Sequence, residues 1–162
     1  MNTINLLLLN LTEVRRRSIK VWKTIPNDKL DWKPDNDALS CAEMIRHVLA
    51  SDYGYLQVIE NRGSLENPEI PFDTRDFISV HEELDFAKPY REKFINLVKS
   101  LSNEDLDNIK IDRSDLTQLG YTGYIRSLGD MLLRIAYHEG VHTGQLLDYM
   151  RTMKIERPDI WD

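Results

Sequence analysis

Apolar residues recur at intervals of three and four positions along four stretches of the chain, the spacing that places them on one face of an α-helix. In the first stretch Leu7, Leu11 and Val21 share this face, and Pro26 then prevents the helix from continuing. Four amphipathic helices of this length predict an all-α protein, a four-helix bundle. The stretches cover about residues 3–25, 40–61, 79–101 and 127–153.

Short polar motifs mark where these helices begin. Ser40 and Glu43 match a capping box, in which the Ser side chain and the acidic side chain three positions later accept hydrogen bonds from the first free amide groups of a helix. Ser79 and Glu82 repeat the motif before the third helix, and Ser127 begins the fourth in the same way. These motifs therefore locate the helix starts more closely than the spacing of apolar residues alone.

The connections between the helices differ in character. Between Ser102 and Arg126 the helical pattern breaks down, with strand-like alternation over residues 108–112 and a turn at residues 120–123, so we expect an irregular insertion before the last helix. The connection between the second and third helices is long enough to cross the length of a bundle, which favours up-down-down-up topology. We expect one domain over residues 1–162.

Charge and composition narrow the classes of function. The chain has 162 residues, a formal net charge of −6 and a pI of about 5.2, which argues against nucleic-acid binding. The one basic cluster, Arg15 to Arg17, is interpreted as a solvated helix face rather than an anion site. The apolar run at residues 6–9 is too short for a membrane span or a signal peptide. The single Cys41 suits a reducing compartment, so we expect a cytoplasmic protein that does not bind membranes.

Three histidines are candidates for chemistry. In the fourth helix His138 and His142 lie four positions apart, so both imidazoles can point toward one ion. In the second helix His47 shares a stripe with Ser51 and Gly54, two small residues that would leave space beside it if this face turned inward. A third imidazole from a facing helix would then complete a three-His site with open positions for water or substrate.

The alternative is that these histidines belong to the core. A lone buried histidine is more often satisfied by a hydrogen bond than bound to a metal. Here, however, two imidazoles and Gln145 interrupt one apolar seam, and burying them without partners would be costly. This favours a divalent ion held by His47, His138 and His142, for which zinc, nickel, iron and copper are all suited.

Two segments of the chain resemble the DinB-like, or YfiT-like, metalloenzyme family. The stronger is the run from His138 to Leu146, HEGVHTGQL, which is similar to the family's last-helix motif of two histidines four apart followed by Gly-Gln. The weaker is Trp32-Lys33-Pro34 followed by Ser40, Glu43 and His47, near the start of the second helix. The resemblance covers nearly the whole chain.

This resemblance implies an up-down-down-up four-helix bundle and a three-His metal site at His47, His138 and His142. Thr143 departs from the family, because many members carry a basic residue there, although the change touches no ligand. Relatives in the wider superfamily are thiol S-transferases, or isomerases that use low-molecular-weight thiols. The resemblance therefore implies a metal-dependent transferase or hydrolase that activates a small thiol or water.

Two residues near the histidines are candidates for substrate binding. Arg134, one turn before His138, could meet an anionic group of a small-molecule substrate, or could simply extend along the surface. Gln145 could orient a bound water or a ligand imidazole. The alternative to catalysis is a binding or structural bundle in which the metal only staples the second and fourth helices together.

Other motifs compete with this interpretation. His138, Glu139 and His142 also read as the HExxH of zinc metalloproteases, with Glu139 as the base, but no histidine follows to serve as third ligand. A di-iron carboxylate site requires Glu and His three positions apart, whereas Glu43 and His47 are four apart. Glu43 is interpreted as the capping partner of the second helix.

Four further residues are interpreted as structural. His81 lies in the first turn of the third helix among acidic residues and should be exposed, and Cys41 should be a packed thiol. Gly140 and Gly144 are costly inside a helix, so we expect another backbone to approach them closely. That neighbour would be the first helix or a second subunit, which makes a homodimer an expectation.

Overall fold

Four long helices form the body of the structure, a computed structural model that describes residues 2–66 and 68–161. Each boundary agrees with the predicted one to within a single residue, so the all-α prediction is confirmed. The helices are α1 (Thr3–Thr24), α2 (Cys41–Asn61), α3 (Val80–Ser100) and α5 (Leu128–Thr152).

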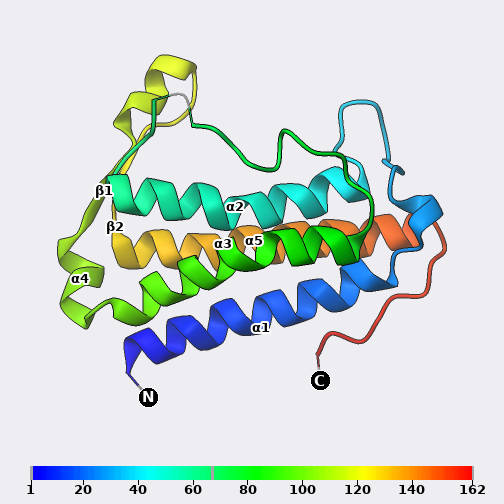
Figure 1. The fold of residues 1–162 in the computed structure, drawn as a ribbon, viewed down its shortest axis with the longest axis horizontal. Helices are drawn as coiled ribbons and strands as arrows, with labels where there is room; N and C mark the ends of the chain where they lie inside the picture. Colours follow the sequence, from blue (N-terminus) through cyan, green and yellow to red (C-terminus); the bar gives the residue numbers. More distant parts are fainter. Residues whose placement is uncertain (1, 67, 162) are drawn as a thin grey trace.

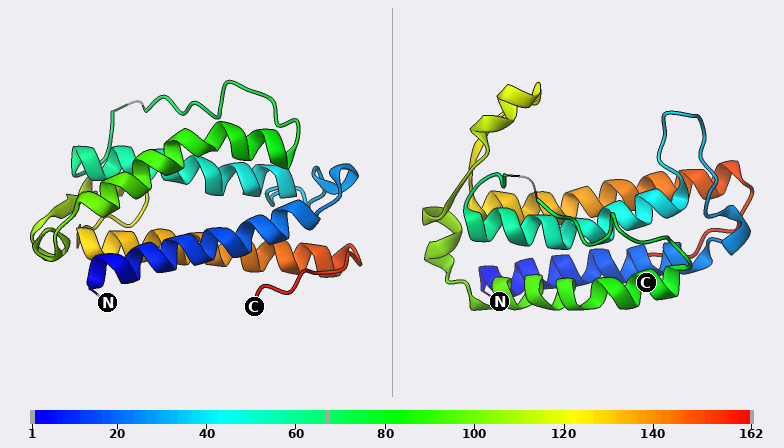
Figure 2. Two further views of the ribbon diagram at one scale, coloured as in Figure 1. Left: turned by 60° about the horizontal axis from the view of Figure 1, so that its bottom comes forward. Right: turned by 45° about the horizontal axis from the view of Figure 1, so that its top comes forward.

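Each long helix packs against two others. Helices α1 and α2 both contact α3 and α5, so α1 and α2 lie at opposite corners of the bundle. In Figure 1, α1 and α5 run from left to right, whereas α2 and α3 run from right to left. The views in Figure 2 show the same arrangement from two other directions. Helices α2 and α5, which carry the candidate histidines, are therefore antiparallel neighbours.

The start of α2 is fixed by the predicted capping box. The Ser40 hydroxyl accepts a hydrogen bond from the Glu43 amide at 3.2 Å, and the Glu43 carboxylate accepts one from the Ser40 amide at 2.7 Å. Both bonds satisfy amide groups that have no partner within the helix. Glu43 is thus a capping residue, as predicted.

The insertion between α3 and α5 is irregular, as expected. It contains α4 (Asn103–Asn108), strand β1 (Lys110–Asp112), the 3-10 helix η2 (Ser114–Leu119) and strand β2 (Ile125–Ser127). The strands pair antiparallel with Ile111 opposite Arg126. A shorter 3-10 helix, η1 (Asn27–Lys29), lies between α1 and α2. The strand-like alternation at residues 108–112 therefore marks a real strand.

A close backbone contact joins β1 to the end of α2. The Asp112 amide donates to the Arg62 carbonyl at 2.9 Å. A Cβ on Gly63 would lie 2.7 Å from the Asp112 carbonyl oxygen, so only glycine fits there. This contact places Arg113, the next residue, beside the carboxyl end of α2.

The core consists of two apolar clusters, one toward each end of the bundle. One contains Trp22, Leu49 and Leu146, and the other contains Leu11, Phe94 and Leu132. Between the clusters, each long helix contributes one charged side chain. These four residues are Arg15 from α1, Asp52 from α2, Arg91 from α3 and Glu139 from α5.

This charged layer corrects the interpretation of the basic cluster. Arg15 is 8% exposed, and its guanidinium donates to both oxygens of Glu139, at 2.7 and 3.1 Å, and to Asp52 at 3.0 Å. Burial by itself would lower the pKa of Arg15, but Asp52 and Glu139 raise it above its ordinary value. The solvated-face prediction is wrong for Arg15, although it holds for Arg16, which pairs with Glu13 at the surface.

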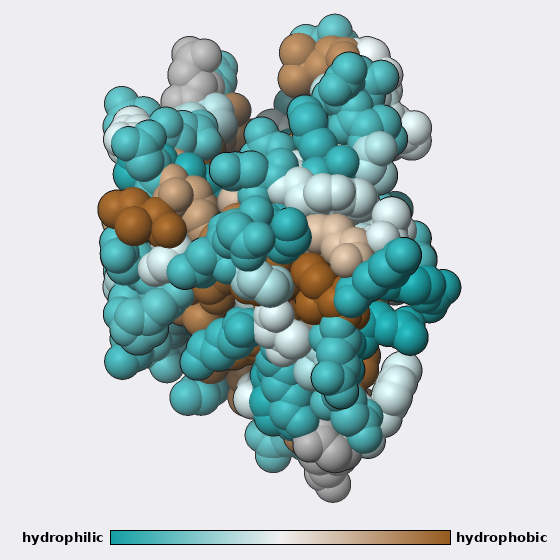
Figure 3. Space-filling model, turned by 90° about the vertical axis from the view of Figure 1, so that its right-hand side faces the viewer, coloured by the Kyte–Doolittle hydropathy of each residue, from teal (hydrophilic) through white to brown (hydrophobic). Residues whose placement is uncertain are grey.

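The surface carries both polar and apolar areas. The end of the molecule in Figure 3 presents mainly hydrophilic residues, with hydrophobic patches between them. Leu133 and Tyr137 on α5 and Leu6 and Leu9 on α1 are exposed apolar residues. Within residues 2–66 and 68–161, no helix combines the length and apolar character needed to cross a membrane.

Candidate metal centre

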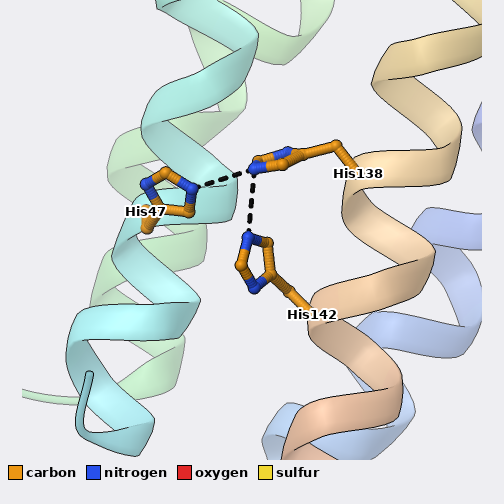
Figure 4. A group of neighbouring side chains, drawn as sticks. All are labelled: His47, His138 and His142. Carbon is orange, nitrogen blue, oxygen red and sulfur yellow. Dashed lines mark hydrogen bonds between the residues drawn. The ribbon is translucent and has the colours of Figure 1, made fainter. Parts of the chain in front are cut away.

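The structure brings the three predicted histidines together. His47 extends from α2 toward His138 and His142 on α5, and the three rings meet in the space between these helices (Figure 4). The Nε2 atom of His138 lies 2.9 Å from that of His47 and 3.1 Å from that of His142. One ligand atom from each ring lies within 4.8 Å of the others.

The histidines occupy the edge of the bundle rather than its core. His138 and His142 are half-buried, and His47 and Gln145 are exposed. The buried face of α5 instead continues through Glu139 and Thr143. The predicted seam was therefore displaced by one position after Ile135, and the histidines open toward solvent.

Hydrogen bonding fixes the tautomer of one ring. His142 Nδ1 lies 2.6 Å from the Gln145 side-chain oxygen, which can only accept, so Nδ1 carries the proton and Nε2 presents a lone pair. A single proton on His138 Nε2 could satisfy only one of its two close nitrogen neighbours. The lone pair of His142 Nε2 is thus directed at the space that it shares with His138.

The electrostatic setting favours the neutral form of His47 and His138. Burial, then the neighbouring His142, His47 and Arg134, lower the pKa of His138 from 6.5 to about 4. Part of the His47 ring is open to solvent, but it packs against both other rings, and this desolvation together with His142 lowers its pKa. Neutral imidazoles are the form that binds metals.

The geometry fits a divalent ion. Nitrogen ligands about 2.1 Å from a tetrahedral ion lie about 3.4 Å apart, close to the 2.9 and 3.1 Å that separate His138 Nε2 from its two neighbours. Among the described residues, this group of ligating side chains has three members, so further coordination positions would be left to water or a ligand. That openness is the pattern of catalytic rather than closed structural sites.

Glu139 is not placed to act as the base of a metalloprotease. Its carboxylate points toward α1, where Arg15 holds both oxygens in a two-pronged contact, and it is 2% exposed. A general base must be within reach of the water that it activates. The HExxH reading therefore fails on geometry as well as on the missing downstream ligand.

The two residues predicted to bind substrate both lie at the edge of this group. Gln145 contacts the His142 ring directly, in the position of a residue that orients a ligand imidazole. Arg134 lies over the Tyr124 ring, 5.2 Å from its centroid, and its charge acts to lower the pKa of the nearby Tyr55 phenol. Their proposed roles toward a substrate remain predictions.

Tyr55 is a neighbour of the histidines that sequence analysis missed. Its ring centroid lies 6.1 Å from that of His138. Burial raises the pKa of the Tyr55 phenol, while Arg134 and Arg113 act in the opposite direction. Eight residues after His47, Tyr55 is turned about 80° round α2 from it, so helix periodicity did not single it out.

The residues interpreted as structural lie outside the site. His81 is exposed beside Asp85 at 3.4 Å, and Cys41 is buried, which raises the pKa of its thiol to about 11. A Cβ on Gly140 would lie 4.0 Å from Val14, an ordinary contact, and one on Gly144 would meet nothing within 4 Å. Close approach by α1 therefore does not explain these glycines.

Comparison with known proteins places this geometry in a family. Residues 10–146 match the profile of the DinB superfamily. The chain belongs to the DinB superfamily. It is similar to the uncharacterized protein YjoA of Bacillus subtilis (strain 168), with 30% identity over 131 residues, which are 80% of this chain and 77% of YjoA. The family expectation from the histidine motif is thus confirmed.

The DinB fold is also shared with a solved structure. The crystal structure of YjoA, a DinB-like protein from Bacillus subtilis, superposes with a TM-score of 0.67 and 22% identity, covering 95% of this chain and 96% of that one. At this identity the likeness concerns the fold alone. For this DinB superfamily member, the case for a metal site therefore depends on its own three histidines.

Proposed function

We propose that this protein holds one divalent metal ion on His47, His138 and His142 and uses it as an enzyme, in S-transfer from a low-molecular-weight thiol or in hydrolysis. The observation that supports this is the convergence of three imidazoles at an open edge of the bundle. When bound, such an ion lowers the pKa of a coordinated thiol or water toward neutrality and so supplies a nucleophile.

The chain's own residues have defined parts in this proposal. Gln145 accepts a hydrogen bond from His142 and fixes the ring so that Nε2 faces the other histidines. Arg134 and Tyr55 lie beside His138 and present donors to an anionic group of the substrate. Because Arg15 holds both oxygens of Glu139, this carboxylate does not take up the proton of an incoming thiol.

The alternative is a bundle in which the ion only staples α2 to α5. A staple needs no open coordination position and is normally closed by a fourth protein ligand. Only three ligating side chains meet in the described part of the chain, which favours the enzyme. We expect the ion to be zinc, nickel or iron, because imidazole ligands suit each of them.

A conjugation assay tests the catalytic part of the proposal. Zinc-, nickel- and iron-loaded protein is mixed with glutathione, cysteine or coenzyme A and a chromogenic electrophile. A metal-dependent acceleration with at least one thiol is expected, with loss in His138→Ala and retention in His81→Ala, an exposed histidine on α3. Metal-loaded protein that accelerates neither conjugation nor ester hydrolysis would leave the staple as the better account.

A further inference from the structure

A cavity of about 260 Å³ lies beside the three histidines. It is bounded by α2 on one side and by the segment that follows α2 on the other, and its walls are mainly apolar or aromatic. Ser51, one turn after His47, lines both this cavity and a neighbouring hollow of about 400 Å³ that includes His47 itself. The residues that matter for its chemistry are Gly54, Tyr55, Val58, Leu65, Ile70 and Arg113.

Gly54 forms an open part of the cavity wall. A Cβ at this position would meet nothing within 4 Å, so no backbone contact requires glycine there. Glycine in the interior of a helix is destabilising, so its presence needs another reason. The reason that the structure offers is space, because any side chain at residue 54 would project into the cavity.

The far end of the cavity is cationic. Arg113 lines this end of the cavity, and its guanidinium Nε donates a hydrogen bond to the Ser64 hydroxyl at 3.1 Å. Ser64 in turn donates to Asp115 at 2.9 Å, which fixes the hydroxyl. Across residues 2–66 and 68–161, Arg113 forms no ion pair with a carboxylate.

Arg113 differs from three arginines of the bundle that form buried ion pairs. Arg15, Arg46 and Arg91 are all paired with buried carboxylates, and the chain as a whole carries a net charge of −6. A second guanidinium, that of Arg134 on α5, is near enough to Tyr55 to act on the pKa of its phenol. An apolar cavity that ends at a cation without an acidic partner is complementary to an amphipathic anion.

We propose that this cavity binds the body of a small organic carboxylate, whose apolar or aromatic chain lies along α2 and whose carboxylate meets Arg113. Seven residues of helix separate His47 from Gly54, a rise of about 10 Å. Arg113 lies further along, beside the carboxyl end of α2, so a molecule that reaches from the histidines to the cationic end must be longer than this. The inference rests on the proposed function in one respect, which is that the same molecule presents its reactive group at the histidines. Binding in the cavity itself does not require the metal.

The test uses 4-phenylbutyrate and its neutral analogue 4-phenylbutyramide, titrated into the full chain and followed by two-dimensional NMR, with and without zinc. The wild-type chain should bind the acid at least tenfold more tightly than the amide, since a guanidinium–carboxylate pair is a charge-assisted contact. Arg113→Met and Arg113→Gln should reduce this preference to within twofold. Arg151→Met, an exposed arginine on α5, is the matched control and should retain it.

Gly54→Leu should fill the cavity and abolish binding of both compounds while the protein stays folded. His138→Ala should bind both as the wild type does. Equal affinity for acid and amide in the wild type would overturn the inference, as would a retained preference in both Arg113 variants or unchanged binding in Gly54→Leu. Metal-loaded wild type that catalyses thiol transfer but ignores the acid would refute the cavity and leave the proposed function standing.

Discussion

Replacing Arg15 by Met should destabilise the protein more than any surface change of similar size. The substitution keeps an unbranched apolar side chain but removes the cation that holds two buried carboxylates. Asp52 is 1% exposed and keeps Arg91 at 2.9 Å, whereas Glu139 is 2% exposed and loses both of its hydrogen bonds to Arg15. The damage should therefore fall mainly on Glu139.

The magnitude follows from what is left behind. Removing one partner of a buried ion pair costs about 3–5 kcal/mol because the other charge stays desolvated. For a chain of this size each kcal/mol shifts the midpoint of thermal unfolding by about 2–4 °C, so Arg15→Met should unfold about 6–20 °C lower. Urea denaturation followed by far-UV circular dichroism gives the free energy of unfolding directly.

The neighbouring arginine provides the control. Arg16 pairs with Glu13 where both side chains are about a third exposed, so Arg16→Met should change stability by no more than about 0.5 kcal/mol. Glu139→Gln in the Arg15→Met background should recover part of the loss by removing the orphaned charge. A loss below about 1 kcal/mol in Arg15→Met, or no recovery in the double variant, would refute this account of the charged layer.

Three other predictions concern the metal, pH and association. Zinc at a hundred times its Kd should stabilise the wild type by about 2.7 kcal/mol, but His138→Ala not at all, which thermal unfolding would show. Without metal, folded His138 stays neutral down to about pH 4, whereas the unfolded chain binds a proton near pH 6.5. Stability should therefore fall as pH drops through this window, and an equal fall in His138→Ala would contradict the prediction. Gly144→Ala should stabilise an isolated subunit by about 0.5–1 kcal/mol and, if the predicted homodimer packs there, weaken association in sedimentation equilibrium, so unchanged association would argue against that interface.

The helices could be predicted from sequence because their signals are local. The spacing of apolar residues at three and four positions and the Ser caps both act within a few residues. The capping box predicted at Ser40 and Glu43 has both of its hydrogen bonds in the structure. The same locality explains the short helix that was missed. Ser102 and Asp105 form a second complete box, but α4 is too brief to show an apolar period.

The burial of charged residues could not be predicted, because their partners are distant in the chain. Arg15 meets Asp52 and Glu139 across 37 and 124 positions of sequence. A run of three arginines on a helix looks solvated unless these partners are known. The buried face of α5 could not be predicted for a similar reason. The predicted apolar seam passes through His138, whereas the face that is buried in the structure passes through Glu139, one position later.

The candidate metal site could be predicted from the sequence only in part. Two histidines four apart on one helix define a local geometry, and His47 was added because it shares a helix stripe with two small residues, a choice that the family resemblance then supported. The cavity next to them depends on how the segment after α2 folds back, and on the contact between Gly63 and Asp112 that positions Arg113. Neither has a sequence period that could reveal it.

Metal content is the most direct test of the three-histidine site. Elemental analysis of purified wild type should find close to one divalent ion per chain, and the same value in His81→Ala. His138→Ala should lose the ion while its circular dichroism spectrum stays that of the wild type. Equal metal content in wild type and His138→Ala would contradict the claim that His47, His138 and His142 share one ion.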